Sequence, residues 1–257
     1  MKRSSVPAIL FASSCVVGLV AIGCTEISSS STAVLSIQFD SLGAPSVVVG
    51  DTLRDTTGAV ARPVVHVFNF KGKEITTAPV YFLSPDSGIT VDSATGIVVA
   101  NSLLSTPARI FATVGTLQAI QKVDVTLSPN FIQAVNRLDT LQYSLADSTL
   151  NVSTQLQVKL THGVAPNDSA VKSYIVSFAI VAQSNPQLGE LVNDGGKVSI
   201  VDTTDVSGVA GRRIRVRPLF LTSAPVDSIV VNATAKYRGV KVNGSPVRLV
   251  LLLKPPG

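Results

Sequence analysis

Short runs of Val, Ile, Leu and Thr, broken about every ten residues by Gly, Pro, Asn or Asp, most constrain how this chain can fold. Within residues 122–127 polar and apolar side chains alternate, which is typical of a strand with one buried and one solvated face. Beyond the first 23 residues, no stretch keeps apolar residues at helical spacing for twelve positions. The pattern therefore predicts an all-β protein.

The first residues carry the pattern of an export signal. A basic start at residues 2–3 precedes residues 8–22, which are almost all apolar or small and too few to remain as a membrane span. The ending Gly23-Cys24 resembles the lipobox of bacterial lipoproteins, although that family usually has Leu where Ala21 stands. The resemblance implies cleavage before Cys24 and lipidation of its sulfur. The alternative is an ordinary secreted protein with a cysteine near its cleavage site.

Removal of that signal leaves enough chain for two β-sandwich domains of ~100 residues each. The sequence has two cysteines, and Cys15 lies inside the signal, so the mature chain is predicted to lack an intrachain disulfide. Pro129 cannot continue a strand ladder and marks the boundary between the domains. We therefore expect a signal peptide, a tether and two sandwich domains at residues 1–23, 24–33, 34–129 and 130–257.

Residues 34–128 resemble a bacterial immunoglobulin-like domain of the group 2 type. The matching segments are residues 80–86, 91–98 and 112–115. In that family the middle segment is a turn with a Thr-Gly pair, so we expect a positive φ at Gly96 and a backbone cap from the Asp92 side chain.

Residues from about 131 to 254 resemble the group 1 type found in the stalks of invasin and intimin. The matching segments are residues 205–210 and 231–239. Together the two resemblances imply tandem immunoglobulin-like β-sandwiches. They rest on turn chemistry, so they imply a fold more strongly than a function.

Positive charge is concentrated near the end of the chain. Between Arg212 and Lys254 there are nine basic residues and one acid, Asp227, whereas the whole chain has a formal net charge of +5. On an exported protein this surface would meet anionic polymers or lipid headgroups, and nucleic acid is excluded as a partner. The alternative is that these residues occupy solvated outer positions and edge strands, where charge deters sheet extension.

One expected strand holds the candidate binding residues. Arg213, Arg215 and Arg217 alternate with Ile214 and Val216, so their guanidinium groups share one face at ~6.6 Å spacing. They are predicted either to bind phosphate or carboxylate groups of an anionic glycan, or to pair with acids on neighbouring strands. The acids expected on those neighbouring strands are Asp202 and Asp227.

The sequence offers little for catalysis. His66 and His162 are its two histidines, expected in a strand and in a turn, and no nucleophile elbow occurs, so a His-based active site is not expected. Glu74 and Glu190 fall in expected surface loops of different domains and cannot form a glycosidase pair. We predict that the protein is not an enzyme.

Metal and cofactor sites are not expected either. Two histidines far apart in sequence and one lipidated cysteine cannot build a zinc site. The acids within residues 86–92 and 202–205 lack the third carboxylate of a calcium loop and are expected to cap turns.

These observations predict a non-catalytic, lipid-anchored envelope protein that acts as a spacer or adhesion module. Its expected partners are the membrane, through the lipid, and an anionic glycan or an envelope protein. Thr25 after the lipidated cysteine favours the outer membrane or the cell surface as its location. The alternative is an accessory subunit of an envelope assembly that binds its partners by adding a strand to an open sheet edge.

Overall fold

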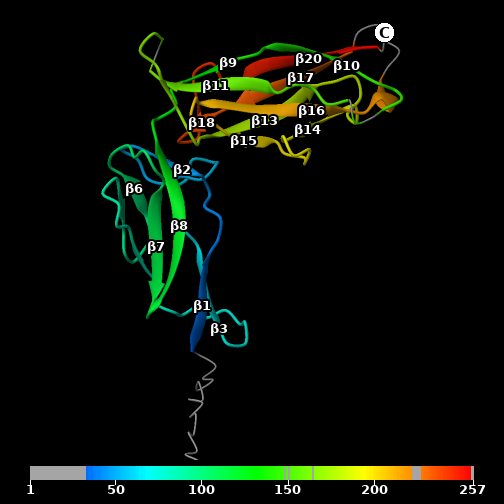
Figure 1. Ribbon diagram of the computed structural model, residues 1–257. Helices are drawn as coiled ribbons and strands as arrows, with labels where there is room; N and C mark the ends of the chain where they lie inside the picture. Colours follow the sequence, from blue (N-terminus) through cyan, green and yellow to red (C-terminus); the bar gives the residue numbers. More distant parts are fainter. Residues whose placement is uncertain (1–32, 148, 150, 164, 222–226, 256–257) are drawn as a thin grey trace, which may run out of the picture.

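The computed structural model describes residues 33–147, 149, 151–163, 165–221 and 227–255. Apart from short 3₁₀ turns such as η2 (Pro218–Phe220), the regular elements of this part of the chain are β-strands, which confirms the all-β prediction. They form two units that meet at an angle (Figure 1). Cys24 and the proposed signal lie outside the described residues.

The N-terminal unit contains one main sheet and two small ones. The main sheet has the strand order β2-β8-β7-β4, and β1 pairs with β3 while β5 pairs with β6. Its strands are β1 (Val34–Phe39), β2 (Ser46–Val48), β3 (Val65–Asn69), β4 (Tyr81–Leu83), β5 (Ile89–Val91), β6 (Val98–Ala100), β7 (Ala108–Val114) and β8 (Leu117–Thr126). Val123 and Val125 of β8 are buried, as their alternation with Lys122 and Asp124 predicts.

The C-terminal unit is a sandwich of two sheets. One sheet has the order β10-β20-β17-β13-β15, and the other has the order β12-β11-β16-β14 with β9 beside β11. Its strands are β9 (Phe131–Ala134), β10 (Leu138–Gln142), β11 (Leu156–His162), β12 (Ser169–Ala170), β13 (Ile175–Ala182), β14 (Gly189–Val192), β15 (Val201–Thr203), β16 (Val209–Val216), β17 (Asp227–Thr234), β18 (Lys236–Tyr237), β19 (Val240–Lys241) and β20 (Val247–Lys254). All the ladders of these sheets are antiparallel except β10 with β20.

Each unit has its own hydrophobic core. The N-terminal core includes Leu53, Val98 and Ile110, and the C-terminal core includes Phe178 and Leu251, all nearly inaccessible to solvent. Inward-facing apolar side chains from facing sheets are the packing of an immunoglobulin-like β-sandwich. The proposed boundary at Pro129 stays a prediction.

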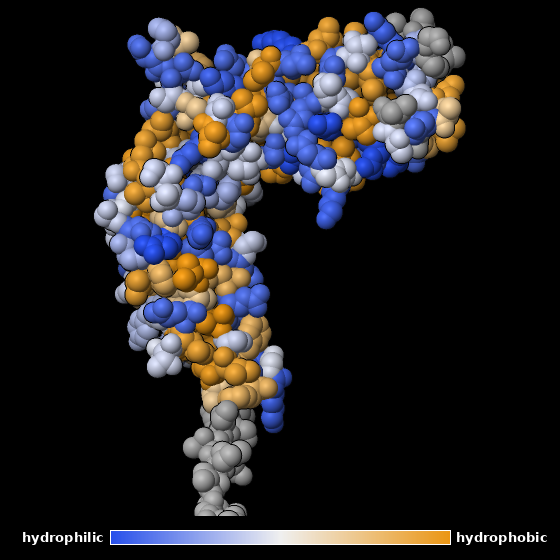
Figure 2. Space-filling model, in the orientation of Figure 1, coloured by the Kyte–Doolittle hydropathy of each residue, from blue (hydrophilic) through white to orange (hydrophobic). Residues whose placement is uncertain are grey.

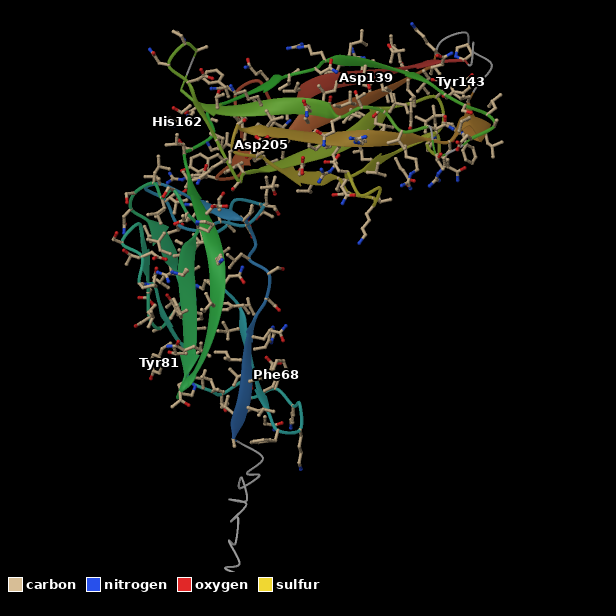
Figure 3. All side chains as sticks on the ribbon, in the orientation of Figure 1. Phe68, Tyr81, Asp139, Tyr143, His162 and Asp205 are labelled. Atoms are coloured by element: carbon tan, nitrogen blue, oxygen red, sulfur yellow. The ribbon has the colours of Figure 1, made fainter. Side chains whose placement is uncertain are left out.

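Aspartate-capped turns connect several strands. The Asp92 carboxylate accepts hydrogen bonds from the backbone N–H of Thr95 (2.7 Å) and of Ala94 (3.2 Å), and Gly96 has φ +70°. Both expectations for this turn are confirmed. Asp205 caps a second turn in the same way, at the end of the C-terminal unit nearest the N-terminal unit (Figure 3).

Two expectations about single residues are wrong. Glu190 lies in strand β14 and not in a surface loop, and His162 is the last residue of β11 and not part of a turn. In both cases the strand continues into the residues expected to interrupt it, because the backbone of each pairs with a neighbouring strand: Glu190 with Arg215, and His162 with Ser169.

The outer face of the N-terminal unit carries apolar side chains over β7 and β8 (Figure 2). Leu83, Phe111 and Ile120 occupy one register across β4, β7 and β8, and the exposed fractions of Leu83 and Ile120 are 45% and 55%. Among the described residues, no helix is both long and apolar enough to cross a membrane.

Candidate functional site

Among the described residues, the side-chain group with the most hydrogen-bond donors around it is the carboxylate of Asp51, at the junction between the two units. Asp51 follows β2, and its backbone is fixed from both sides: its N–H donates to Val48 O at 2.9 Å and its carbonyl accepts from Ala100 N at 3.0 Å. Only 4% of its side chain is exposed. A buried carboxylate is stable only when its oxygens are paired and hydrogen-bonded.

Six donors surround that carboxylate. Oδ1 accepts from the Thr52 backbone N–H at 2.8 Å, from the Thr52 hydroxyl at 3.5 Å and from Arg54 Nη2 at 2.9 Å. Oδ2 accepts from Arg54 Nε at 2.9 Å and, across the junction, from Arg238 Nε at 2.8 Å and the Tyr237 hydroxyl at 3.0 Å. We call Asp51, Arg54, Tyr237 and Arg238 the Asp51 clamp, because it joins residues far apart in the chain through a single carboxylate.

The electrostatics of the clamp favour the ionised carboxylate. Burial alone would raise the pKa of Asp51, but the hydrogen bonds from Arg54, Arg238, Thr52 and Tyr237 together lower that pKa far below its usual range. Burial and the hydrogen bond to Asp51 raise the pKa of Tyr237. The clamp is therefore an ion pair with a neutral phenol at physiological pH.

Left-handed backbone occurs where the C-terminal unit reaches toward the N-terminal unit. Among the described non-glycine residues, φ is positive at Ser173 (55°) and Arg238 (51°). The Ser173 hydroxyl donates to Asp124 Oδ2 at 2.7 Å, and Arg238 donates to Asp51. Such conformations cost free energy and persist where their surroundings hold them in place. Both strained residues thus present a donor to an aspartate of the other unit.

Two glycine turns touch backbone to backbone beside the clamp. A Cβ atom on Gly58, whose φ is +95°, would lie 2.2 Å from the backbone N of Gly239. Gly58 also supplies the carbonyl that Arg54 Nη1 contacts at 2.9 Å. The close approach requires glycine, and it places the β18–β19 hairpin directly against the N-terminal unit.

The junction encloses a cleft of about 250 Å³. Its walls hold two aromatic rings, Tyr174 and Tyr237, and three cationic side chains, Arg54, Lys236 and Arg238. The Ser and Thr residues that line it are Ser46, Thr52, Thr56, Ser177 and Thr234. The Tyr174 hydroxyl donates to Lys236 O at 2.7 Å, which fixes that ring against the β18 strand. Aromatic faces, hydroxyls and cations together make this cleft the best candidate for a binding site.

The arginine row predicted from the sequence lies elsewhere: Arg213 and Arg215 lie in β16, and Arg217, which was expected in the same strand, follows its end and precedes η2. Arg213 pairs with Asp194 at 3.1 Å, and Arg215 and Arg217 both pair with Glu190, at 3.2 and 3.0 Å. Ile214 and Val216 point into the core, as expected. The row therefore has acidic partners, and anion binding by it stays a prediction.

The identity of those partners differs from the expectation. Asp202 pairs with Arg212 at 2.8 Å, and Asp227 accepts a hydrogen bond from the Ser184 hydroxyl, so neither serves the row. The reason is register: β14 lies beside β16 and brings Glu190 opposite Arg215, whereas β17, which holds Asp227, belongs to the other sheet.

The remaining acids and histidines do not converge. His66 Nδ1 lies 2.6 Å from Glu74 and its Nε2 lies 3.1 Å from Asp40, so these acids flank opposite sides of the ring. His162 Nδ1 lies 2.8 Å from the Ser128 carbonyl. Within the described residues, no three His, Cys, Asp or Glu side chains are grouped as they would be around a metal ion.

Sequence reasoning missed the clamp. Asp51 and Tyr237 are 186 positions apart, and the hydrogen bond between them has no local sequence pattern. The usable signals were weak: the spacing of Asp51 and Arg54, and a Tyr-Arg-Gly turn in a hairpin.

No protein-family model matches this chain, and no curated protein does. Solved structures do match. Domains 1–6 of the surface layer protein SbsC align at 10% identity and a TM-score of 0.33, over 88% of this chain and 29% of that chain. Human protocadherin-24 EC1-2 aligns at 12% identity and a TM-score of 0.28, over 87% and 98%. An endo-fucoidan hydrolase from glycoside hydrolase family 107 aligns at 9% identity and a TM-score of 0.34, over 85% and 34%.

Proposed function

We propose that the protein is a non-catalytic, lipid-anchored component of a bacterial cell envelope, acting as a spacer that presents its C-terminal unit for adhesion. The observation that carries this proposal is the Asp51 clamp, which ties the two sandwiches together through the buried carboxylate of Asp51. Inter-domain contacts of moderate size and polar character usually permit relative motion. A clamp of this kind instead supports a fixed presentation of the second unit.

The placement of the chain ends supports the same role. Strand β1 begins at the end of the N-terminal unit that is remote from the C-terminal unit (Figure 1). A lipid on Cys24 would therefore hold this end of the N-terminal unit at the membrane and leave the C-terminal unit furthest from the membrane. Lys172 Nζ and Leu104 O, 3.3 Å apart, add a further link between the units.

Fractionation of cells tests the anchoring. The wild-type chain is expected in the outer membrane and labelled by a fatty-acid probe, whereas Cys24→Ser is expected in the soluble fraction without label. Cys15→Ser is the matched control, since it changes the other cysteine of the sequence within the proposed signal. A Cys24→Ser variant that still labels and still partitions with membrane contradicts the proposal.

The second candidate function is an accessory subunit of an envelope assembly, binding partners by strand addition. One observation favours it: β15 is an edge strand, and Val198 and Ile200 just before it are 66% and 60% exposed. Exposed apolar edges pair readily with other chains. An assembly subunit is expected to co-purify with partners from its own solubilised membrane, and Ile200→Lys should abolish that co-purification, while a spacer is recovered alone.

A further inference from the structure

We propose that the junction cleft binds an acidic saccharide, with Lys236 and the outer edge of Arg238 holding its carboxylate. The proposal gives a ligand class to the adhesion role above and therefore rests on it. It also moves the expected glycan contact from the outer face of β16 to the cleft between the units.

Two cationic groups in the cleft have donors to spare. Arg54 is fully engaged, because its Nε and Nη2 contact Asp51 and its Nη1 contacts Gly58 O. Arg238 donates from Nε to Asp51 and also interacts with the neighbouring Tyr237 hydroxyl, which leaves part of its five-donor guanidinium for a ligand. The Lys236 ammonium likewise has no ion-pair partner among the described residues. A guanidinium and an ammonium that line the same cleft are donors that suit a carboxylate.

The charge of the cleft also favours an anion. The negative charge of Asp51 is consumed by the clamp, and Asp55 on the rim has its Oδ1 occupied by the N–H and hydroxyl of Thr57 and by Ala59 N. Three cations face these two acids across the lining, so the cleft carries a net charge of +1. The Arg238 guanidinium also lies over the Tyr237 ring, 5.3 Å from its centroid, which helps to hold it in the lining of the cleft.

The rest of the lining matches a sugar ring better than a simple anion. Tyr174 and the face of Tyr237 that Arg238 does not cover supply flat apolar surfaces for the C–H side of a pyranose, and five Ser and Thr residues supply hydroxyl partners. The cleft is slightly smaller than the roughly 300–1,000 Å³ that hold drug-sized ligands. It therefore fits the end of a glycan chain, about one acidic sugar residue at a time.

The test is a titration of the full-length protein in detergent with trigalacturonate and with its fully methyl-esterified form. The chain has no Trp and four Tyr, of which Tyr174 and Tyr237 line the cleft, so a ligand there should change part of the tyrosine fluorescence. We expect trigalacturonate to quench that part saturably and the neutral ester to bind at least tenfold more weakly, because the ester cannot form a charge-assisted hydrogen bond. Tyr174→Phe should retain binding but reduce the fluorescence change.

Lys236→Gln and Lys241→Gln form a matched pair. Lys241 lies opposite Lys236 in the β18–β19 hairpin but does not line the cleft. Only Lys236→Gln should weaken trigalacturonate binding, by about tenfold. Equal loss in both variants would mean that the general positive field attracts the ligand, and equal affinity for acid and ester would mean that charge is irrelevant. Either result, or no binding at millimolar ligand, overturns the proposal, whereas the fractionation of Cys24→Ser tests the anchoring separately.

Discussion

The Asp51 clamp and the Arg213–Arg217 row are built from the same chemical groups but have different surroundings. In the clamp, the acid is 4% exposed and accepts from two arginines and a tyrosine. The clamp arginines, Arg54 and Arg238, are 27% and 51% exposed. In the row, the arginine side chains are 38–50% exposed, and the acids Asp194 and Glu190 are 67% and 23% exposed, so the two sites differ mainly in the burial of the acid. Exposed ion pairs contribute little, because water screens them and long side chains lose entropy.

The difference indicates that the burial of the acid and the number of donors around it, not the density of charge in the sequence, decide how much an ion pair stabilises the fold. The row is the most regular charge pattern of the chain, yet it lies on an outer strand face with its acids already in place. The clamp is assembled from residues that lie far apart in the sequence. Among the described residues, it is the place where a buried carboxylate links the two units.

The largest effect is expected from Gly58→Ala. The new side chain must adopt a φ of +95° and place its Cβ 2.2 Å from Gly239 N, so the hairpin has to move away and the clamp has to open. We expect a loss of about 2–4 kcal/mol in the free energy of unfolding, from the left-handed backbone and the clash together. Urea unfolding measures the loss, and small-angle scattering measures the change in the angle between units.

Gly72→Ala is the matched control for that variant. Gly72 has φ +70° in the turn after β3, but nothing lies within 4 Å of its added Cβ. Gly72→Ala should therefore lose only the free energy that a left-handed backbone costs an alanine, about 1 kcal/mol. If both variants lose the same stability and keep the same scattering profile, the glycine contact is not a determinant of the junction.

The second effect is expected from Asp51→Asn, which keeps the shape of the side chain but removes its charge. Breaking a fully buried ion pair costs about 3–5 kcal/mol, but Arg54 and Arg238 can partly rehydrate, so we expect about 1–3 kcal/mol. Asp194→Asn in the row is expected to cost less than about 0.5 kcal/mol. Comparable losses at the two sites would remove the distinction between clamp and row.

Much of the fold was predictable from the sequence, because strand and turn chemistry is local. The alternation in β8, the Asp92 cap and the left-handed Gly96 each depend on residues within a few positions. The strand pairing that places Glu190 beside Arg215 was not predictable in the same way, because it depends on which sheet each strand joins. The clamp was still further out of reach, since it depends on how two separate cores meet.

The third expected effect is small and concerns the row itself. Replacing Arg213, Arg215 and Arg217 together by Gln keeps length and polarity, so the protein should fold, with a loss below about 1 kcal/mol for each pair. If the row also binds an anionic glycan, the triple variant should bind it more weakly, and the wild-type interaction should fade with salt, since screening acts over ~8 Å at physiological ionic strength. Equal binding by both proteins at low salt would falsify the row as a binding surface. A variant that fails to fold would show that its ion pairs, like the clamp, are structural.

The smallest effect separates an exposed ionic cluster from the buried one by its response to pH. Hydrogen bonds to Glu74 and Asp40 raise the pKa of His66 above its ordinary 6.5. The folded state therefore binds the proton more tightly than the unfolded chain does, so the contribution of His66 is fully present below pH 6.5 and is lost as pH rises through the folded pKa. The lowered pKa of Asp51 gives the opposite pH dependence: its contribution to stability is present above its unfolded pKa of 3.8 and is lost only as pH falls below that value.

Between pH 5.5 and 9, the stability difference between wild type and His66→Gln should therefore shrink as pH rises, while the difference between wild type and Asp51→Asn should stay constant. Urea unfolding across that range measures both, and a His66→Gln difference that does not change with pH would show that the two carboxylates contact an uncharged ring.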